Sequence, residues 1–176
     1  MAKVLLLLAL VLALAAHQAG AHRTLKQAAP VPSPANASNE FLDAHNKARA
    51  EVGVEPLKWS EKLAKDTSLL VRYQRDKKGC EFADLTPGKY GANQLLGSGV
   101  KWTPRLAVEA WVAEKMYYNH ANNSCETGRK CGVYTQVVWG KSAELGCALA
   151  ACPKQQLSLT ICFYDPPGNV AGESPY

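Results

Sequence analysis

The hydrophobic positions of this 176-residue chain change their spacing along the sequence, from a helical period in the first half to an alternating one near the end. A first helix is predicted over residues 39–52, with Gly53 as its stop, because apolar residues and one histidine, His45, recur there every three or four positions. A second helix is predicted from Ser60 towards Arg75 on the same grounds.

The third predicted helix has the clearest start signal. Thr103 is a capping residue and Pro104 occupies the first helical position. Its apolar row carries Trp111 and Glu114, and an unpaired carboxylate on such a face would be costly. Residues 79–103 are rich in glycine and turn formers, which predicts a long loop with little regular structure.

Alternation replaces the helical period near the C-terminus. Apolar and polar residues alternate over 157–164, which predicts a strand with two unlike faces. Residues 145–151 are the expected partner strand, joined to it through a turn at 153–155. Helices that precede strands in this way indicate an α+β layer fold.

The N-terminal 38 residues are predicted to lie outside the folded domain. Residues 1–21 have the layout of a secretory signal peptide, and 22–38 form a Pro- and Ala-rich flexible linker. No later stretch is long and apolar enough for a membrane helix, so the mature chain is expected outside the cytosol. Removal of the signal peptide takes away Lys3 and lowers the formal charge from +5 to +4. Such a mildly basic protein is compatible with binding to an anionic wall or membrane surface, but its charge is far from that typical of a nucleic-acid-binding protein.

The cysteine count adds a second sign of secretion. An even number of cysteines in a secreted protein predicts three disulfides, but spacing alone does not choose among fifteen connectivities. Zinc thiolates are disfavoured because the chain has no Cys-x2-Cys pair. Asn36 and Asn122 lie in sequons and are candidate glycosylation sites. The six cysteines are Cys80, Cys125, Cys131, Cys147, Cys152 and Cys162.

Six short motifs occur together in a particular order. They are AHNKAR at 44–49, LKW at 57–59, AVEAW at 107–111 with Glu114 three residues on, CGVYTQVVW at 131–139, LGCA at 145–148 and CFYDPPGN at 162–169. In this order the chain resembles the CAP superfamily (SCP domain), and within it the plant pathogenesis-related proteins of group one, from residue 39 to 176. The resemblance implies a three-layer α/β/α sandwich with a small antiparallel sheet. It also implies disulfides between Cys80 and Cys152, Cys125 and Cys131, and Cys147 and Cys162.

The resemblance further implies a central cleft in which two histidines and two glutamates can bind a divalent ion such as zinc. The matching positions here are His45 and Glu114, whereas Ala92 and Val133 stand where the family usually has a glutamate and a histidine. Because a zinc site ordinarily needs three or four protein ligands, metal binding is expected to be weak or absent, with no cofactor and no enzymatic activity. His45 and Glu114 are expected to hydrogen-bond each other or nearby backbone.

The last fourteen residues, FYDPPGNVAGESPY, indicate a different kind of function. The two prolines must end the preceding strand, and the remainder is expected to lie on the surface, open to proteolysis. In the resembled plant family this region marks the precursor of an eleven-residue defence-signalling peptide. Here that peptide corresponds to residues 166–176, released by a protease between Asp165 and Pro166, although Phe163 stands where the family usually has asparagine.

Three function classes follow from these observations. The first is a secreted, non-enzymatic, antimicrobial plant defence protein that binds sterols or other lipids of microbial membranes, as the resemblance implies. The second is the hormone precursor, which can coexist with the first. The third is a metal-dependent hydrolase of the CAP type, disfavoured by Ala92 and Val133. The expected state is an apoplastic monomer without nucleic-acid partners.

Overall fold

A computed structural model describes residues 34–86, 88–98 and 101–176. The predicted signal peptide, 1–21, therefore lies outside the described residues. No helix in the described ranges is long and apolar enough to cross a membrane. The elements, in chain order, are α1 (Pro34–Ala50), β1 (Lys58–Trp59), α2 (Glu61–Lys77), β2 (Gly91–Ser98), α3 (Pro104–Val112), the 3-10 helix η1 (Ala113–Tyr117), β3 (Tyr118–Asn119), the 3-10 helix η2 (His120–Asn122), β4 (Ser124–Cys125), α4 (Gly132–Val137), β5 (Glu144–Cys152) and β6 (Leu157–Asp165).

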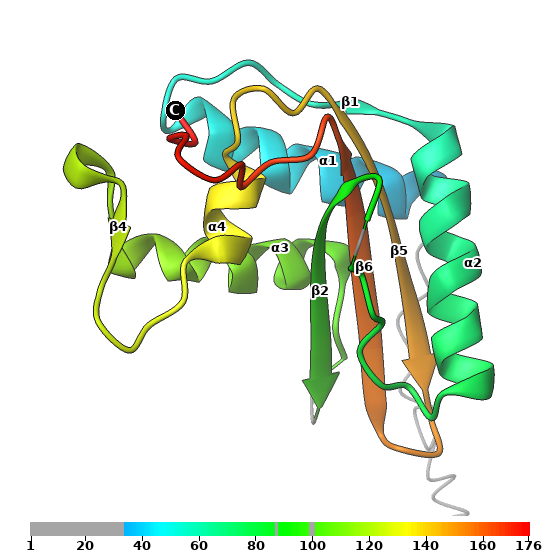
Figure 1. Cartoon of the computed structure of the whole chain (residues 1–176). Helices are drawn as coiled ribbons and strands as arrows, with labels where there is room; N and C mark the ends of the chain where they lie inside the picture. The colour runs from blue at the N-terminus through cyan, green and yellow to red at the C-terminus, as the bar shows by residue number, and fades with distance from the viewer. Residues whose placement is uncertain (1–33, 87, 99–100) are drawn as a thin grey trace, which may run out of the picture. The chain divides into compact units, whose positions relative to one another are not determined.

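The main sheet has the strand order β1-β5-β6-β2 (Figure 1). Its three long strands are antiparallel neighbours, in agreement with the antiparallel sheet that the resemblance implied, while the two-residue β1 runs parallel to β5 and makes the sheet mixed. A separate pair, β3 and β4, forms a short antiparallel hairpin. The alternating segment 157–164 and its partner 145–151 are thus confirmed as adjacent strands.

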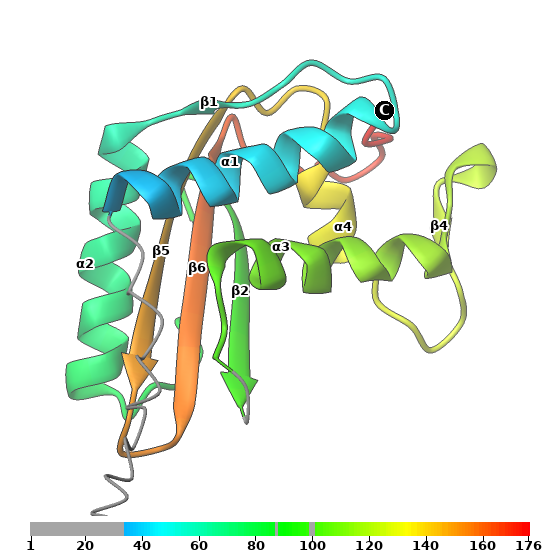
Figure 2. The same ribbon diagram turned by 180° about the vertical axis from the view of Figure 1, so that it is seen from behind.

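Helices cover both faces of the main sheet, which confirms the α/β/α layering. In Figure 1 α2 packs along β5, and Figure 2 shows α1 and α3 running across the strands on the other side. Leu159 and Ile161 of β6 pack with Val71 of α2, whereas Cys162 and Tyr164 pack with the other three helices. The two unlike faces predicted for this strand are therefore both buried, each in its own core.

The glycine of the LGCA motif sets the distance between α2 and the sheet. A Cβ added at Gly146 would lie 2.2 Å from the amide nitrogen of Ala64 and 2.4 Å from Leu63. Any larger residue would push the helix off β5, since backbone atoms cannot yield as a flexible side chain can. The motif thus has a packing role.

Three disulfides join these layers, with the pairing that the family resemblance implied. Cys80–Cys152 ties the turn that follows α2 to the end of β5, and Cys147–Cys162 joins β5 to β6 at directly opposed positions. Cys125–Cys131 closes a short loop before α4. Closed loops of this kind stabilise a small domain mainly by restricting its unfolded chain.

Helix boundaries and one strand differ from the predictions. α1 begins at Pro34, so the end of the predicted 22–38 linker is helical, and its proline is compatible with a first helical turn. Residues 91–98 form β2 and are not a loop, because eight consecutive residues pair with β6. α3 is capped by Thr103 as predicted but ends at Val112, which leaves Glu114 in η1.

Arg49 in the AHNKAR motif is fully buried and holds α4 in place. Its Nη1 donates to the carbonyls of Val137 and Trp139 at 3.2 and 2.8 Å, and its Nη2 donates to that of Ser142 at 3.0 Å. Its Nε donates to the carbonyl of Glu55 at 2.7 Å. Burial lowers the pKa of Arg49 to about 10, so the guanidinium stays charged at neutral pH.

Replacing Arg49 should therefore be strongly destabilising. Arg49→Met keeps much of the aliphatic stem but leaves four carbonyls without their donor. We expect the free energy of unfolding to fall by about 3 kcal/mol, measured by urea denaturation, because each unsatisfied buried group costs roughly 1–3 kcal/mol before relaxation. The control Arg105→Met, at an exposed position of α3, should change it by less than about 0.5 kcal/mol. Equal effects of the two changes would contradict the role given to Arg49.

Candidate functional site

His45, the first predicted cleft residue, lies fully buried on α1 with both ring nitrogens engaged. Nδ1 lies 2.7 Å from the carbonyl of Phe41, and Nε2 lies 2.8 Å from the hydroxyl of Tyr164. A carbonyl can only accept, so Nδ1 carries the proton and Nε2 accepts from the tyrosine. The neutral ring has no nitrogen left for a metal ion.

A chain of hydrogen bonds continues from His45 across the sheet. The amide of Asn93 on β2 donates to the Tyr164 hydroxyl at 3.1 Å and to the carbonyl of Val133 at 2.9 Å. The network therefore joins α1, β6, β2 and α4 through groups that satisfy one another. Buried polar groups connected in this way specify one packing arrangement, because each unpaired member would be costly.

Burial also sets the protonation of this network. Desolvation lowers the pKa of His45 to about 4, with the nearby charge of Arg49 adding to the effect and the Phe41 carbonyl opposing it. Burial raises the pKa of Tyr164 well above its ordinary range. Both rings are thus neutral at physiological pH.

Glu114, the second predicted cleft residue, is only partly buried and does not lie on α3. Its Oε2 accepts from the backbone N–H of Val133 at 3.3 Å. Burial raises the pKa of its carboxyl, while the N–H groups of Val133 and Tyr134 at the start of α4 oppose that shift. His45 and Glu114 were predicted to hydrogen-bond each other or nearby backbone. Each of them bonds to backbone, and the structure shows no hydrogen bond between the two side chains.

The four family cleft positions do not form a metal site here. Ala92 and Val133 have no ligand atoms in their side chains, and His45 is engaged at both nitrogens. Among the described residues, no group of three or more His, Cys, Asp or Glu side chains could hold a metal ion. The donor set does not fit the zinc that the family resemblance implies.

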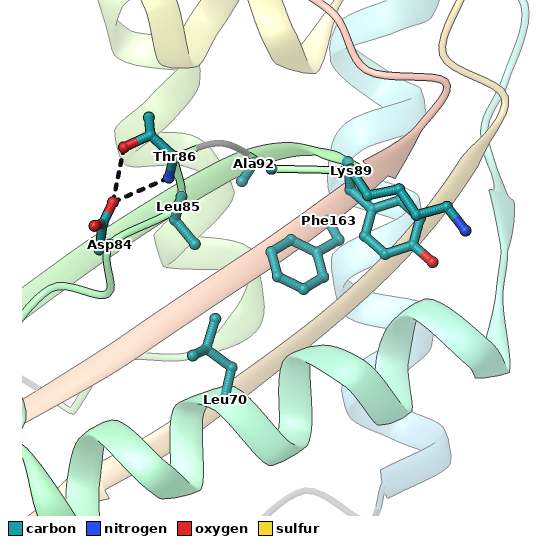
Figure 3. A pocket seen from close by; sticks show the side chains of 9 residues that line it. Leu70, Asp84, Leu85, Thr86, Lys89, Ala92 and Phe163 are labelled. Carbon is teal, nitrogen blue, oxygen red and sulfur yellow. Dashed lines mark hydrogen bonds between the residues drawn. The ribbon is translucent and has the colours of Figure 1, made fainter.

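A hollow of about 170 Å³ lies between α2, β2, β6 and the segment that precedes β2. Figure 3 shows Leu70 reaching from α2 toward Phe163 on β6, with Leu85 and Ala92 beside them. Asp84 lies at its edge and accepts from the N–H and hydroxyl of Thr86 at 3.0 and 2.8 Å. The hollow is therefore apolar inside and polar at the rim, and neither His45 nor Glu114 lines it.

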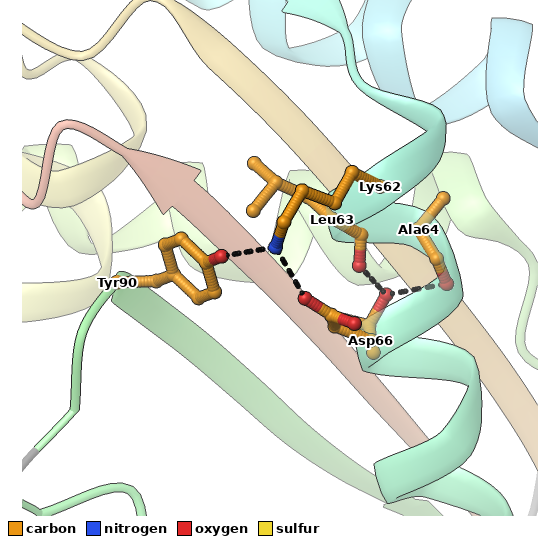
Figure 4. A network of polar contacts seen from close by, with 6 residues as sticks. Lys62, Leu63, Ala64, Asp66 and Tyr90 are labelled. Carbon is orange, nitrogen blue, oxygen red and sulfur yellow. Dashed lines mark hydrogen bonds and ion pairs between the residues drawn. The ribbon is translucent and has the colours of Figure 1, made fainter.

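Tyr90 at the rim of the hollow is tied to α2 by a lysine. Lys62 donates both to the Tyr90 hydroxyl and to Asp66, and Figure 4 shows its ammonium between the two acceptors. The Lys89 ammonium lies 5.2 Å from the centre of the same ring. These contacts fix the aromatic side chain at the edge of the hollow.

The CGVYTQ motif forms α4, and α4 binds the C-terminal segment. Thr135 donates its hydroxyl to Oδ1 of Asn169 at 2.7 Å, and Asn169 donates to the carbonyl of Gly132 at 2.8 Å. Gln136 accepts from the N–H of Gly168 at 3.0 Å, and a Cβ at Gly168 would come within 2.6 Å of both Gln136 and Trp139. Two motifs far apart in sequence thus meet here.

The end of the segment is held by an aromatic contact. Tyr176 stacks on His120, with ring centres 4.3 Å apart and planes 9° from parallel, and its hydroxyl lies 3.2 Å from that of Tyr134. The N–H of Gly140 donates to the carbonyl of Pro175 at 2.7 Å. The tail, predicted to be a plain surface segment, is exposed at most positions but is held along its length.

The remaining predicted sites lie at the surface or at the end of the sheet. Asn36, in α1, and Asn122, in η2, are both exposed. Asp165 is the last residue of β6, opposite Glu144, and its carbonyl accepts from Ala143. The first residue of the predicted cleavage site, Asp165, therefore belongs to the sheet, and Pro166 follows it.

Comparison with known proteins agrees with this architecture. Residues 42–164 match the family described as CAP, the Cysteine-rich secretory protein family. The STS14 protein of Solanum tuberosum is 66% identical over 140 residues, which are 80% of this chain and 65% of that protein. Pathogenesis-related protein PR-1 of Medicago truncatula is 46% identical over 78% of each chain. The structure of Schistosoma mansoni venom allergen-like protein 4 matches with a TM-score of 0.61 at 26% identity, over 82% of this chain and 95% of that one.

The chain therefore belongs to the CAP family of cysteine-rich secretory proteins. Its plant relatives include pathogenesis-related proteins of group one from Medicago and tobacco, at 46% identity. The chain spans just under two thirds of the potato STS14 protein. Three disulfides agree with a secreted protein of this family.

The buried histidine predicts a particular pH dependence of stability. An unfolded histidine titrates near pH 6.5, whereas folded His45 titrates near 4, so only the unfolded chain gains this proton as the pH falls between those values. The free energy of unfolding should fall by about 2 kcal/mol from this group alone between about pH 7.5 and 5, measured by urea denaturation.

Two variants isolate the contribution of His45. His45→Gln should remove most of this pH dependence, even if it lowers stability overall. His120→Gln, at an exposed position, should leave it intact. A wild-type stability that stays flat over this range would show that His45 titrates normally.

Proposed function

We propose that this protein is a secreted plant defence protein of the apoplast that binds sterols or other lipids of microbial membranes and has no enzymatic activity. The observation that carries the proposal is the apolar hollow between α2 and the sheet, lined by Leu70, Leu85, Ala92 and Phe163. Ligand pockets are typically apolar inside with a few polar groups at fixed places, and this hollow has that character.

The size of the hollow limits how such a ligand binds. At about 170 Å³ it is smaller than the roughly 300–1,000 Å³ of pockets that enclose drug-sized molecules. A sterol would therefore insert one part, such as a ring edge or its alkyl branch, and leave the rest outside. Binding in this mode gains mainly from apolar area removed from water.

The residues of the family cleft support a role without catalysis. His45 is neutral and fully enclosed, and the backbone of α4 donates to Glu114. A general acid or base must reach the proton that it transfers, and a ring with both nitrogens bonded to protein does not. The metal-dependent hydrolase remains the disfavoured alternative.

Filling the hollow should weaken lipid binding without harming the fold. In Ala92→Leu the larger side chain occupies space that the ligand needs, so we expect binding of radiolabelled sterol to weaken by at least about tenfold, or 1.4 kcal/mol. Ala151→Leu makes the same chemical change at an exposed position of β5 and should bind sterol as the wild type does. Unchanged binding by Ala92→Leu would place the ligand elsewhere, and no binding by the wild type would end the proposal.

We infer as a second function that residues 166–176 form a defence-signalling peptide, PPGNVAGESPY, released by a protease after Asp165. The contacts of this segment support the inference. They are hydrogen bonds, the ion pair of Glu173 with Lys141 and aromatic contacts of Tyr176, which packs against the edge of one core. The buried residues that make up both cores lie before residue 166. The segment can therefore leave while the core remains intact.

A chain that ends at Asp165 tests whether the segment is separable. It should fold with all three disulfides and the wild-type far-ultraviolet circular dichroism, because every cysteine, helix and strand precedes the cut. The synthetic peptide, applied to leaf tissue at nanomolar to micromolar concentration, should induce defence genes, and a scrambled peptide should not. A truncated chain that fails to fold would exclude release from an intact domain. An inactive peptide would exclude the signalling role.

A further inference from the structure

The face of α2 that points away from the sheet exposes large apolar side chains. Leu69 and Tyr73 are 53% and 50% exposed, and residues four apart on a helix are neighbours. Phe82, just beyond the helix, is 54% exposed, and its carbonyl accepts from Gln74 of α2 at 2.9 Å. The other face of α2 packs on the sheet through Leu63 and Val71, so the fold does not need this outer face.

The same helix concentrates positive charge. Between Glu61 and Lys78 six cations oppose three carboxylates, which gives a net charge of +3 in a chain whose formal charge is +5. Asp66 is bonded to Lys62, and Asp76 to Arg75. The four cations that take part in no ion pair within the described part of the chain are Lys65, Arg72, Lys77 and Lys78.

Positive and apolar side chains are interleaved on this face. Lys65 and Lys77 lie four residues before Leu69 and four after Tyr73, on neighbouring turns of the helix. The Lys78 ammonium lies 6.0 Å from the centre of the Tyr73 ring. We call Leu69, Tyr73 and Phe82 together with Lys65, Arg72, Lys77 and Lys78 the basic apolar face. Asp66 and Asp76, three residues before Leu69 and three after Tyr73, lie on the same side of the helix, and each is paired with a cation.

We propose that the basic apolar face of α2 docks onto the surface of an anionic lipid bilayer. Helices that lie in the membrane interface present aromatic or aliphatic side chains to the acyl boundary and lysine or arginine to acidic headgroups. Complementary charge selects the partner, because the unpaired lysines attract anionic headgroups. A soluble polyanion such as an acidic polysaccharide would use the cations but not the three exposed apolar side chains.

The basic apolar face would be the surface by which the protein reaches a membrane. Its biological role rests on the proposed function, which places the protein at microbial membranes. The physical claim is separate from the sterol site. None of the seven residues of the basic apolar face lines the hollow. Docking and sterol binding can therefore fail independently.

Cosedimentation with sterol-free vesicles tests the docking. The full mature chain should bind phosphatidylcholine vesicles that contain phosphatidylserine at least tenfold more tightly than vesicles of phosphatidylcholine alone, and salt at 0.5 M should remove that preference. The triple variant Leu69→Ser, Tyr73→Ser, Phe82→Ser should lose at least tenfold in partition. The charge variant Lys65→Glu, Lys77→Glu should lose at least as much, and its sterol binding in vesicle-free solution should stay at the wild-type level.

Matched controls carry the same chemical changes elsewhere. Leu106→Ser with Met116→Ser removes exposed apolar side chains from α3 and η1, and Arg105→Glu with Lys130→Glu reverses two exposed charges. Both controls should bind anionic vesicles within twofold of the wild type. Wild-type binding by either α2 variant, an equal loss in the controls, or binding to soluble polygalacturonate but not to vesicles would overturn the proposal. Loss of sterol binding with vesicle docking intact would overturn only the proposed function.

Discussion

The structure depends on one buried charge, the guanidinium of Arg49. A buried cation without a carboxylate is tolerated only where carbonyl oxygens solvate it. Here the end of α4 and the residues after it supply three of those oxygens, and Glu55 supplies the fourth. The carbonyls of Val137 and Trp139 lie at the C-terminal end of α4, where a positive charge is favourable. Arg49 thereby fixes α4, and α4 in turn presents the backbone of Val133 to Asn93 and the side chains of Thr135 and Gln136 to the tail.

Beside Arg49, the residues at the family cleft positions take part in the packing of the fold. His45 retains its place on α1, but its nitrogens are satisfied by Phe41 and Tyr164, and the network ends at the carbonyl of Val133. Val133 no longer supplies an imidazole, yet its backbone receives one hydrogen bond and donates another to Glu114. In this chain the motif contributes backbone groups to the network, and the Val133 side chain has no ligand atom.

Much of the fold could be predicted from the sequence, because the helices and the last two strands have a clear period and clear caps. β2 could not be predicted, since a glycine-rich segment acquires its strand geometry only from pairing with β6. The place of Glu114 depended on α3 changing to a 3-10 helix after Val112, which apolar spacing does not signal. The role of Arg49 was missed because its acceptors are backbone carbonyls, three of them 88 to 93 residues away, for which side-chain patterns carry no signal. The partners of the tail on α4 were missed because they lie 32 to 42 residues away in the sequence, and periodicity carries no signal for contacts between separate segments.

The docking of the tail on α4 has a consequence for the body that would remain after a cut. Water would replace the hydrogen-bond partners that the tail now supplies to Thr135, Gln136 and the N–H of Gly140. The ring of His120 would no longer be covered by Tyr176. The cut and uncut forms would then differ along a continuous strip beside α4. A receptor or an antibody that binds this strip could distinguish processed from unprocessed protein without contacting the released peptide.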